Sequence, residues 1–196
     1  MNDYQIRFLK QSVLGQTVRM NISKEVIKRC IVLADRDMLS GGRFICNFFK
    51  IKTSKERVDY FFRVLERADY VYEKIDKEAV CDSIFWECDE TRHPFVQGKK
   101  RTYKPYGLAQ KLVNMTFKYL YVYKDHIEKD IDFSTCDCPI DSVVLGRIES
   151  KENWTNLTKE EYDRIQSIIS EKLQEERYGS LKGEIGRMAF DDTWAD

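Results

Sequence analysis

The sequence lacks acidic residues over one long segment. No Asp or Glu occurs from Thr91 to Lys124, although the chain of 196 residues carries 33 acidic and 33 basic side chains. The same segment contains eight basic residues: Arg92, Lys99, Lys100, Arg101, Lys104, Lys111, Lys118 and Lys124. Zero net charge argues against a protein that coats nucleic acid without specificity. The cationic segment indicates either an anion-binding face or a solvated loop that contacts acidic neighbours.

Long apolar runs are also missing. No stretch approaches the roughly 20 apolar residues that a membrane-spanning helix needs, so we expect no membrane partner. The first ten residues, MNDYQIRFLK, show no apolar run of the kind found in a secretory leader. We therefore expect a cytoplasmic protein with reduced cysteines. The two histidines, His93 and His126, have no nearby Cys or Ser that suggests a catalytic dyad.

The six cysteines suggest one metal site as an alternative. Cys136 and Cys138, together with Cys81 and Cys88, supply four thiols. Zinc sites usually contain close CxxC pairs, whereas here one pair is CxC and the other is spaced by seven residues. We expect buried cysteines, no metal and no cofactor.

Helical periodicity dominates the rest of the chain and predicts a mainly α fold. The predicted helices span residues 23–39, 54–76, 77–90, 107–123, a short stretch from 142, and 158–176. Residues 43–52, RFICNFFKIK, are compatible with a strand or a short helix. Residues 92–107 contain two of the three prolines and predict a loop. A small N-terminal β-hairpin around Gly15 is compatible with the weak alternation in residues 4–22.

Polar residues mark the expected helix starts. Ser23, Ser54 and Asp141 are suitable N-caps. Thr158 and Glu161 have the spacing of a capping box. The pair Gly41-Gly42 is expected to close the helix that begins near Ser23.

We expect residues 1–196 to form one globular unit. Residues 22–90 and 107–176 would be two helical halves around a cleft. Residues 178–196, which contain several glycines, are expected to be a loosely held tail.

Two lysines on the helix 107–123 stand out. Lys111 and Lys118 are seven residues apart, so they lie on one helix face two turns apart, with Asn114 between them. The core stripe beside them contains Leu108, Leu112, Met115, Tyr119 and Val122. Partial burial and a second cation both favour the neutral amine, which is a nucleophile. The alternative is that both stems lie along apolar surface and their ammonium groups reach water.

The stretch KLVNMTFK, followed thirty residues after its first lysine by CPIDSVVL, resembles the helix-hairpin-helix DNA glycosylase superfamily. The nearest likeness is to its divergent archaeal branch that acts on 8-oxoguanine, which has a catalytic lysine opening a helix, a second lysine seven residues on, and a later Pro-x-Asp. Lys111, Lys118, Pro139 and Asp141 match these positions. The resemblance covers residues 107–148. The Leu-Pro-Gly-Val-Gly hairpin of the common glycosylases is replaced here by KPYGLAQK.

The resemblance implies a helical, glycosylase-like architecture and a DNA repair activity with AP-lyase chemistry. Lys111 would attack the sugar C1′, expel a damaged base such as an oxidised purine, and form a Schiff base. Asp141 would stabilise the developing positive charge and accept a proton. Lys118 would keep the Lys111 amine partly neutral or contact phosphate. The partner would be double-stranded DNA with a damaged base, bound by a monomer.

The basic loop supplies further candidate DNA contacts. The phosphate-binding candidates are Lys99, Lys100, Arg101 and Lys104; Tyr103 and Tyr106 would stack or wedge, and Asn114 would face the DNA. Helix N-termini near Gly107 and Ser142 offer backbone N–H groups to the same anions. Two other interpretations stay open: a noncatalytic helical protein that binds nucleic acid or a partner, and a helical protein of another role whose basic segment is structural. In both, Asp141 is a plain N-cap.

Overall fold

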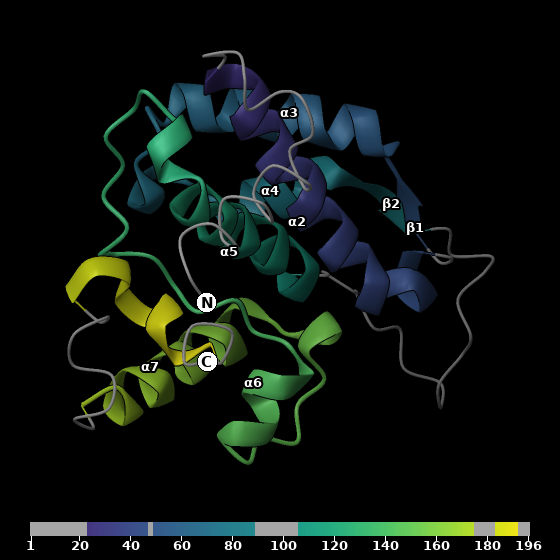
Figure 1. Ribbon diagram of the computed structural model, residues 1–196. Coiled ribbons are helices and arrows are strands. Elements are labelled where there is room, and N and C mark those ends of the chain that lie inside the picture. The colour runs from purple at the N-terminus through teal and green to yellow at the C-terminus, as the bar shows by residue number, and fades with distance from the viewer. Residues whose placement is uncertain (1–22, 47–48, 89–105, 175–182, 192–196) are drawn as a thin grey trace.

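The computed structural model describes residues 23–46, 49–88, 106–174 and 183–191. These residues are mainly helical, as predicted (Figure 1). In chain order the elements are α2 Ser23–Cys46, β1 Phe49–Ile51, α3 Ser54–Arg67, the 3₁₀ turn η2 Tyr72–Lys74, α4 Lys77–Ile84, β2 Phe85–Cys88, α5 Tyr106–Val122, η3 Lys124–His126, α6 Ser142–Arg147, η4 Trp154–Asn156, α7 Lys159–Lys172 and η6 Gly186–Phe190. The expected N-terminal hairpin and most of the loop 92–107 lie outside the described residues.

Helix α5 is the centre of the fold. It lies between the group formed by α2, α3 and α4 and the group formed by α6 and α7 (Figure 1). Thirteen consecutive residues, from Tyr106 to Lys118, are buried. A helix that is buried all round must satisfy its polar side chains inside the protein. The polar side chains of α5 therefore need hydrogen-bond or ion-pair partners from other elements. Among the described residues, no helix is long and apolar enough to cross a bilayer.

The helix starts confirm two of the predicted caps and correct a third. Thr158 and Glu161 form the expected capping box at α7. Asp141 caps α6. At α3 the cap is Thr53, not Ser54, and Thr53 forms a capping box with Glu56. The prediction missed Thr53 because Ser54, directly beside it, is an equally good capping residue.

Helix α3 ends earlier than predicted. The expected helix 54–76 stops at Arg67, because Asp69 (φ 50°) and Tyr70 (φ 62°) adopt left-handed backbone conformations. The Tyr70 amide donates to the Leu65 carbonyl at 2.9 Å, which satisfies a carbonyl in the last turn of the helix. No glycine marks this stop, so the sequence pattern did not reveal it.

Two other element boundaries also differ from the prediction. Helix α2 continues through Gly41 and Gly42 to Cys46, because a glycine costs a helix interior only about 1 kcal/mol and tertiary structure can override it. The segment 43–52 is split between the end of α2 and the strand β1. The predicted helix 77–90 ends at Ile84, after which β2 pairs antiparallel with β1, with Phe49 opposite Cys88.

The described part of the C-terminal segment is packed instead of loose. Ile185 and Met188 are fully buried. The Arg187 amide donates to the Cys136 carbonyl at 2.9 Å. Gly186 has φ +56°, and a Cβ there would lie 2.4 Å from the Ser134 carbonyl oxygen. Residues 183–191 therefore form a fixed part of the fold, against the expectation of a loosely held tail.

Gly107 sets how closely η4 approaches α5. A Cβ at this position would lie 1.7 Å from the Trp154 carbonyl oxygen. Any side chain at residue 107 would therefore displace the turn that carries Trp154. The N-terminus of α5 near Gly107 meets protein backbone here, where the sequence had suggested an anion contact.

We predict that Gly107→Ala lowers the free energy of unfolding by about 1–3 kcal/mol, because it overpacks this contact. The matched control is Gly146→Ala in α6, where a Cβ meets nothing within 4 Å. There the substitution should be neutral or stabilising by up to about 1 kcal/mol. Urea unfolding of both variants measures the difference. Equal stabilities would contradict the contact.

Candidate functional site

Asp141 begins α6 and has a fixed orientation. One carboxylate oxygen, Oδ1, accepts from the amides of Val143 and Val144 at 2.9 and 3.1 Å. The backbone of Asp141 is extended (φ −139°, ψ −171°), as in most N-cap residues. This capping leaves Oδ2 free to take another partner.

That partner is Lys111 on α5. Lys111 Nζ lies 2.8 Å from Asp141 Oδ2, and the two side chains are 9% and 29% exposed. The Nζ atom also lies 5.0 Å from the centroid of the Trp154 ring. The structure thus brings together the two residues to which the sequence assigned the central roles, and places an aromatic ring beside them.

The environment of Asp141 favours its ionised form. Burial by itself would raise the pKa of this carboxyl. The hydrogen bond and charge of Lys111, with the amides of Val143 and Val144, outweigh burial and lower the pKa below its usual range. At neutral pH, Asp141 is therefore a carboxylate that can stabilise a positive charge or accept a proton.

Comparisons with protein-family models, curated proteins and solved structures gave no match for this chain. The catalytic roles of Lys111 and Asp141 accordingly stay predictions. They are based on the contact between the two side chains and on the resemblance over residues 107–148.

Lys118 does not share the carboxylate of Lys111. Its Nζ lies 2.7 Å from Oδ2 of Asp191, which follows η6. Both side chains are largely buried, at 10% and 15% exposure. The two lysines of α5 therefore have separate counter-ions, and the Lys118 pair joins α5 to the C-terminal segment.

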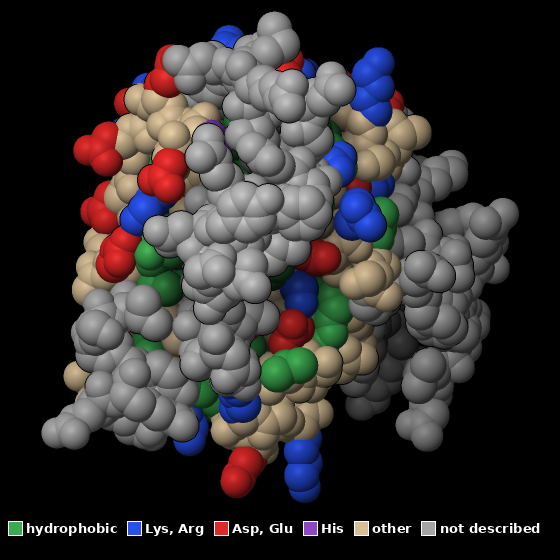
Figure 2. Space-filling view, in the orientation of Figure 1, with side chains coloured by type: hydrophobic (Ala, Val, Ile, Leu, Met, Phe, Trp, Pro, Cys, Tyr) green, Lys and Arg blue, Asp and Glu red, His purple; other side chains and the backbone are tan. Residues whose placement is uncertain are grey.

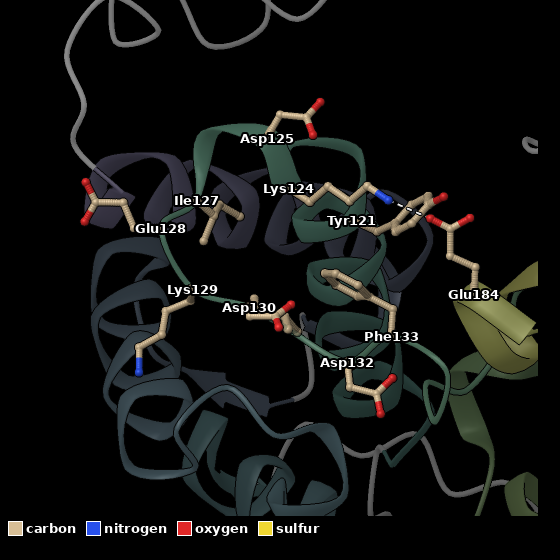
Figure 3. A pocket seen from close by; sticks show the side chains of 11 residues that line it. Tyr121, Lys124, Asp125, Ile127, Glu128, Lys129, Asp130, Asp132, Phe133 and Glu184 are labelled. Atoms are coloured by element: carbon tan, nitrogen blue, oxygen red, sulfur yellow. Dashed lines mark hydrogen bonds and ion pairs between the residues drawn. The ribbon is translucent and has the colours of Figure 1, made fainter.

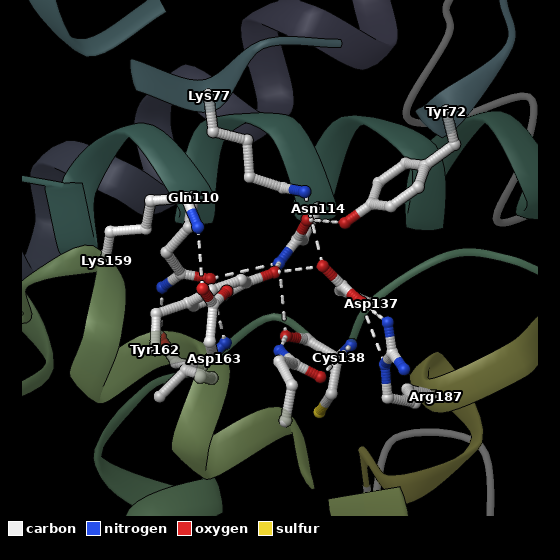
Figure 4. Close-up of polar contacts among 12 residues, drawn as sticks. Tyr72, Lys77, Gln110, Asn114, Asp137, Cys138, Lys159, Tyr162, Asp163 and Arg187 are labelled. Carbon is white, nitrogen blue, oxygen red and sulfur yellow. Dashed lines mark hydrogen bonds and ion pairs between the residues drawn. The ribbon is translucent and has the colours of Figure 1, made fainter. Parts of the chain in front are cut away.

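Asn114, between the two lysines, lies in a buried network of polar side chains (Figure 4). It is 0% exposed. Its Oδ1 accepts from the Tyr72 hydroxyl at 2.6 Å, and its Nδ2 lies 3.0 Å from the Tyr162 hydroxyl oxygen and 3.1 Å from Gln110 Oε1. The expected DNA contact of Asn114 is therefore corrected, because its amide is used inside the protein.

Asp137 anchors the same network. Its Oδ2 accepts from the Tyr162 hydroxyl at 2.5 Å and pairs with Lys77 Nζ at 3.2 Å, while Oδ1 accepts from Arg187 Nε at 2.8 Å. Burial would raise the pKa of Asp137, but Lys77 and Arg187 outweigh burial and lower it. Burial and the adjacent Asp137 raise the pKa of Tyr162 well above its usual value, so this hydroxyl remains a donor. The sequence did not reveal this cluster, whose only visible sign was Asp137 within CDCPID.

The remaining candidate DNA contacts have different positions. Tyr106 is buried, and its ring packs edge-on against Tyr162 with centroids 5.4 Å apart, so it is a core residue. The other candidates, Lys99, Lys100, Arg101, Tyr103 and Lys104, lie outside the described residues. On the face drawn in Figure 2, the basic side chains of the described residues are scattered and form no continuous patch.

The described cysteines are buried thiols. Cys30, Cys81, Cys136 and Cys138 are buried and reduced, and burial raises the pKa of Cys30, Cys136 and Cys138. The side chain of Cys88 lies outside the part that the structure describes. Within that part, no three His, Cys, Asp or Glu side chains are grouped as metal ligands.

An open hollow of about 740 Å³ has neither Lys111 nor Asp141 in its lining (Figure 3). Its lining residues are Tyr121, Lys124, Asp125, Ile127, Glu128, Lys129, Asp130, Ile131, Asp132, Phe133 and Glu184. Lys124 pairs with Glu184 at 2.6 Å and lies over the Tyr121 ring. Because the lining carries five acidic and two basic side chains, it does not suit a DNA backbone.

We predict that Asp141→Ala is less stable than Asp141→Asn by about 1 kcal/mol, because Asn keeps the cap and Ala removes it. Both variants lose the charge that pairs with Lys111. The wild type should be more stable than Asp141→Asn above about pH 5, and this advantage should shrink as the pH falls through the lowered pKa of Asp141. Urea unfolding between pH 3 and 7 provides the measurement. An advantage that is constant with pH would contradict the ion pair.

Proposed function

We propose that this protein is a DNA repair glycosylase with AP-lyase activity, in which Lys111 forms a Schiff base with the sugar. The observation that carries the proposal is the 2.8 Å contact between Lys111 Nζ and Asp141 Oδ2, two groups from different elements. Their order matches, and their spacing nearly matches, the lysine and aspartate of the archaeal branch of the helix-hairpin-helix glycosylases. The proposed substrate is double-stranded DNA with a damaged base, bound by a monomer.

The pair provides an amine and a proton acceptor in contact. Lys111 must lose a proton before it can attack C1′, and Asp141 Oδ2 is within hydrogen-bond distance to accept it. The new C1′–N bond replaces the glycosidic bond, whose electron pair leaves with the base. Opening of the C1′–O4′ bond then gives the imine. Loss of a C2′ proton breaks the C3′–O3′ bond and nicks the strand.

The surroundings of the amine support this chemistry. The Trp154 ring lies beside Nζ, and the Lys111 side chain is only 9% exposed. The capped Asp141 carboxylate can stabilise positive charge at C1′ without reorienting, since its Oδ1 is held by two amides.

The segment from Thr91 to Lys124 supports DNA as the partner. It contains eight basic residues and no acidic ones. Lys111 and Lys118 are paired with carboxylates, and Lys124 is paired with Glu184. The phosphate contacts are therefore assigned to the loop residues Lys99, Lys100, Arg101 and Lys104.

A noncatalytic nucleic-acid-binding protein is the second candidate. The same ion pair favours it, because a lysine that only balances a buried carboxylate needs no further role. In that case the Lys111–Asp141 pair joins α5 to α6, and the basic loop alone binds the nucleic acid.

Borohydride trapping distinguishes the two candidates. An abasic duplex is the appropriate probe, because the lyase step does not depend on which base was removed. We predict that the wild-type protein forms a covalent adduct with this duplex and that Lys111→Gln reduces the adduct to background. Lys77→Gln is the matched control, since the Lys77 side chain is also largely buried, at 12% exposure, and is also paired with an aspartate, Asp137; its adduct should persist.

Two outcomes would contradict the assignment. An unaltered adduct in Lys111→Gln would exclude Lys111 as the nucleophile. Salt-sensitive binding of the duplex by the wild type, without any adduct, would favour the noncatalytic protein.

A further inference from the structure

A side-chain amide on α5 holds the chain that leads to Asp141. Gln110 is 0% exposed. Its Nε2 donates to the Ile140 carbonyl at 2.8 Å, and its Oε1 accepts from the Ile140 amide at 3.2 Å. In an antiparallel sheet, a residue in the neighbouring strand pairs with both the amide and the carbonyl of the residue opposite it, as the Gln110 side chain does here. Gln110 therefore takes the place of a strand beside Ile140.

The position of this contact is significant. Gln110 directly precedes Lys111, and Ile140 directly precedes Asp141. The two hydrogen bonds thus join the residue before the amine to the residue before the carboxylate. They fix the distance between α5 and the segment before α6, at the residues directly adjacent to Lys111 and Asp141.

A second glutamine makes the same contact further upstream. Gln166 Nε2 donates to the Cys138 carbonyl at 2.7 Å, and its Oε1 accepts from the Cys138 amide at 3.2 Å. This contact is three residues from Asp141, on the far side of Pro139. Gln166 is also buried, at 4% exposure, so it supplies a matched comparison for Gln110.

Only a neutral group with both a donor and an acceptor fits at residue 110. A methionine side chain has nearly the same shape but neither donates nor accepts these hydrogen bonds. Both the amide and the carbonyl of Ile140 would therefore lose this partner. A glutamate carboxylate accepts but cannot donate to the Ile140 carbonyl. A protonated glutamic acid has both functions and can reproduce the glutamine contact.

We propose that Gln110 is a positioning residue that holds Asp141 against Lys111 through the backbone of Ile140. Its effect on activity rests on the proposed glycosylase function, but its effect on the position of Asp141 does not. A structural test and a catalytic test can therefore fail separately.

The structural test is an NMR titration of the Asp141 carboxyl carbon, assigned by its loss in Asp141→Asn. In Gln110→Met the pKa of Asp141 should rise toward the ordinary value, because the carboxylate moves away from the Lys111 ammonium. In the control Gln166→Met it should stay near that of the wild type. The proposal is overturned if Asp141 titrates in Gln110→Met as it does in the wild type, or if both variants shift it equally.

The catalytic test uses borohydride trapping of the abasic duplex as a function of pH. Gln110→Met should form the adduct more slowly by on the order of 100-fold, as expected when reacting groups are misplaced by about 1 Å. Gln110→Glu should be close to the wild type at acidic pH and lose activity as the pH rises, because a buried carboxyl has a raised pKa and stays protonated at low pH. A Gln110→Glu profile that parallels the wild type at every pH would overturn the positioning role.

The two tests also separate this proposal from the function on which it rests. Absence of any adduct with the wild type, together with a shifted pKa of Asp141 in Gln110→Met, would contradict the glycosylase function and support the positioning role of Gln110. If Gln110→Met does not fold, Gln110→Glu at low pH still decides the question. A folded Gln110→Glu whose Asp141 carboxyl carbon has the same chemical shift as in the wild type at pH values where residue 110 is charged would overturn the proposal.

Discussion

The structure depends on how one extended segment satisfies its backbone. Within the part of the chain that the structure describes, residues 137–141 have no strand beside them, yet Cys138 and Ile140 are fully buried. A buried amide or carbonyl without a partner costs about 1–3 kcal/mol, so a segment of this kind is stable only if other groups replace the missing strand. Gln110 of α5 and Gln166 of α7 do so. The segment consequently has a fixed path between the two helices and ends at the cap of α6.

Each buried charged side chain around this segment has at least one partner of opposite charge. Lys111 pairs with Asp141, Lys118 pairs with Asp191, and Asp137 is balanced by Lys77 and Arg187. Buried ion pairs contribute little net stability compared with apolar residues of the same size, but removing one partner is costly. These pairs join segments that are distant along the chain. Helix α5 is tied by them to α6 and to the C-terminal residues 183–191.

The sequence predicted the parts of the structure that are encoded locally. The capping residues Asp141 and Thr158 were identified because capping depends on residues within one turn. The spacing of Lys111 and Lys118 placed them on one face of α5. Their partners were harder to find, since Asp191 is 73 residues from Lys118. Only the resemblance to the glycosylases linked Lys111 to Asp141.

The features that the sequence did not predict depend on contacts distant along the chain. Arg187 reaches Asp137 across 50 residues, and Gln166 reaches Cys138 across 28. The sequence does not distinguish a buried glutamine on a helix from an exposed one, because a polar residue at either position fits the helical pattern of apolar residues. Asn114 was assigned to the DNA for the same reason.

The most direct test of the account is a double-mutant cycle on the ion pair, with Lys111→Met, Asp141→Asn and the double variant compared by urea unfolding at pH 7. Both side chains are largely buried, so we predict a coupling free energy of about 1 kcal/mol or more in favour of the pair. Strictly additive effects of the two substitutions would contradict the contact between Lys111 and Asp141, and with it the proposed site.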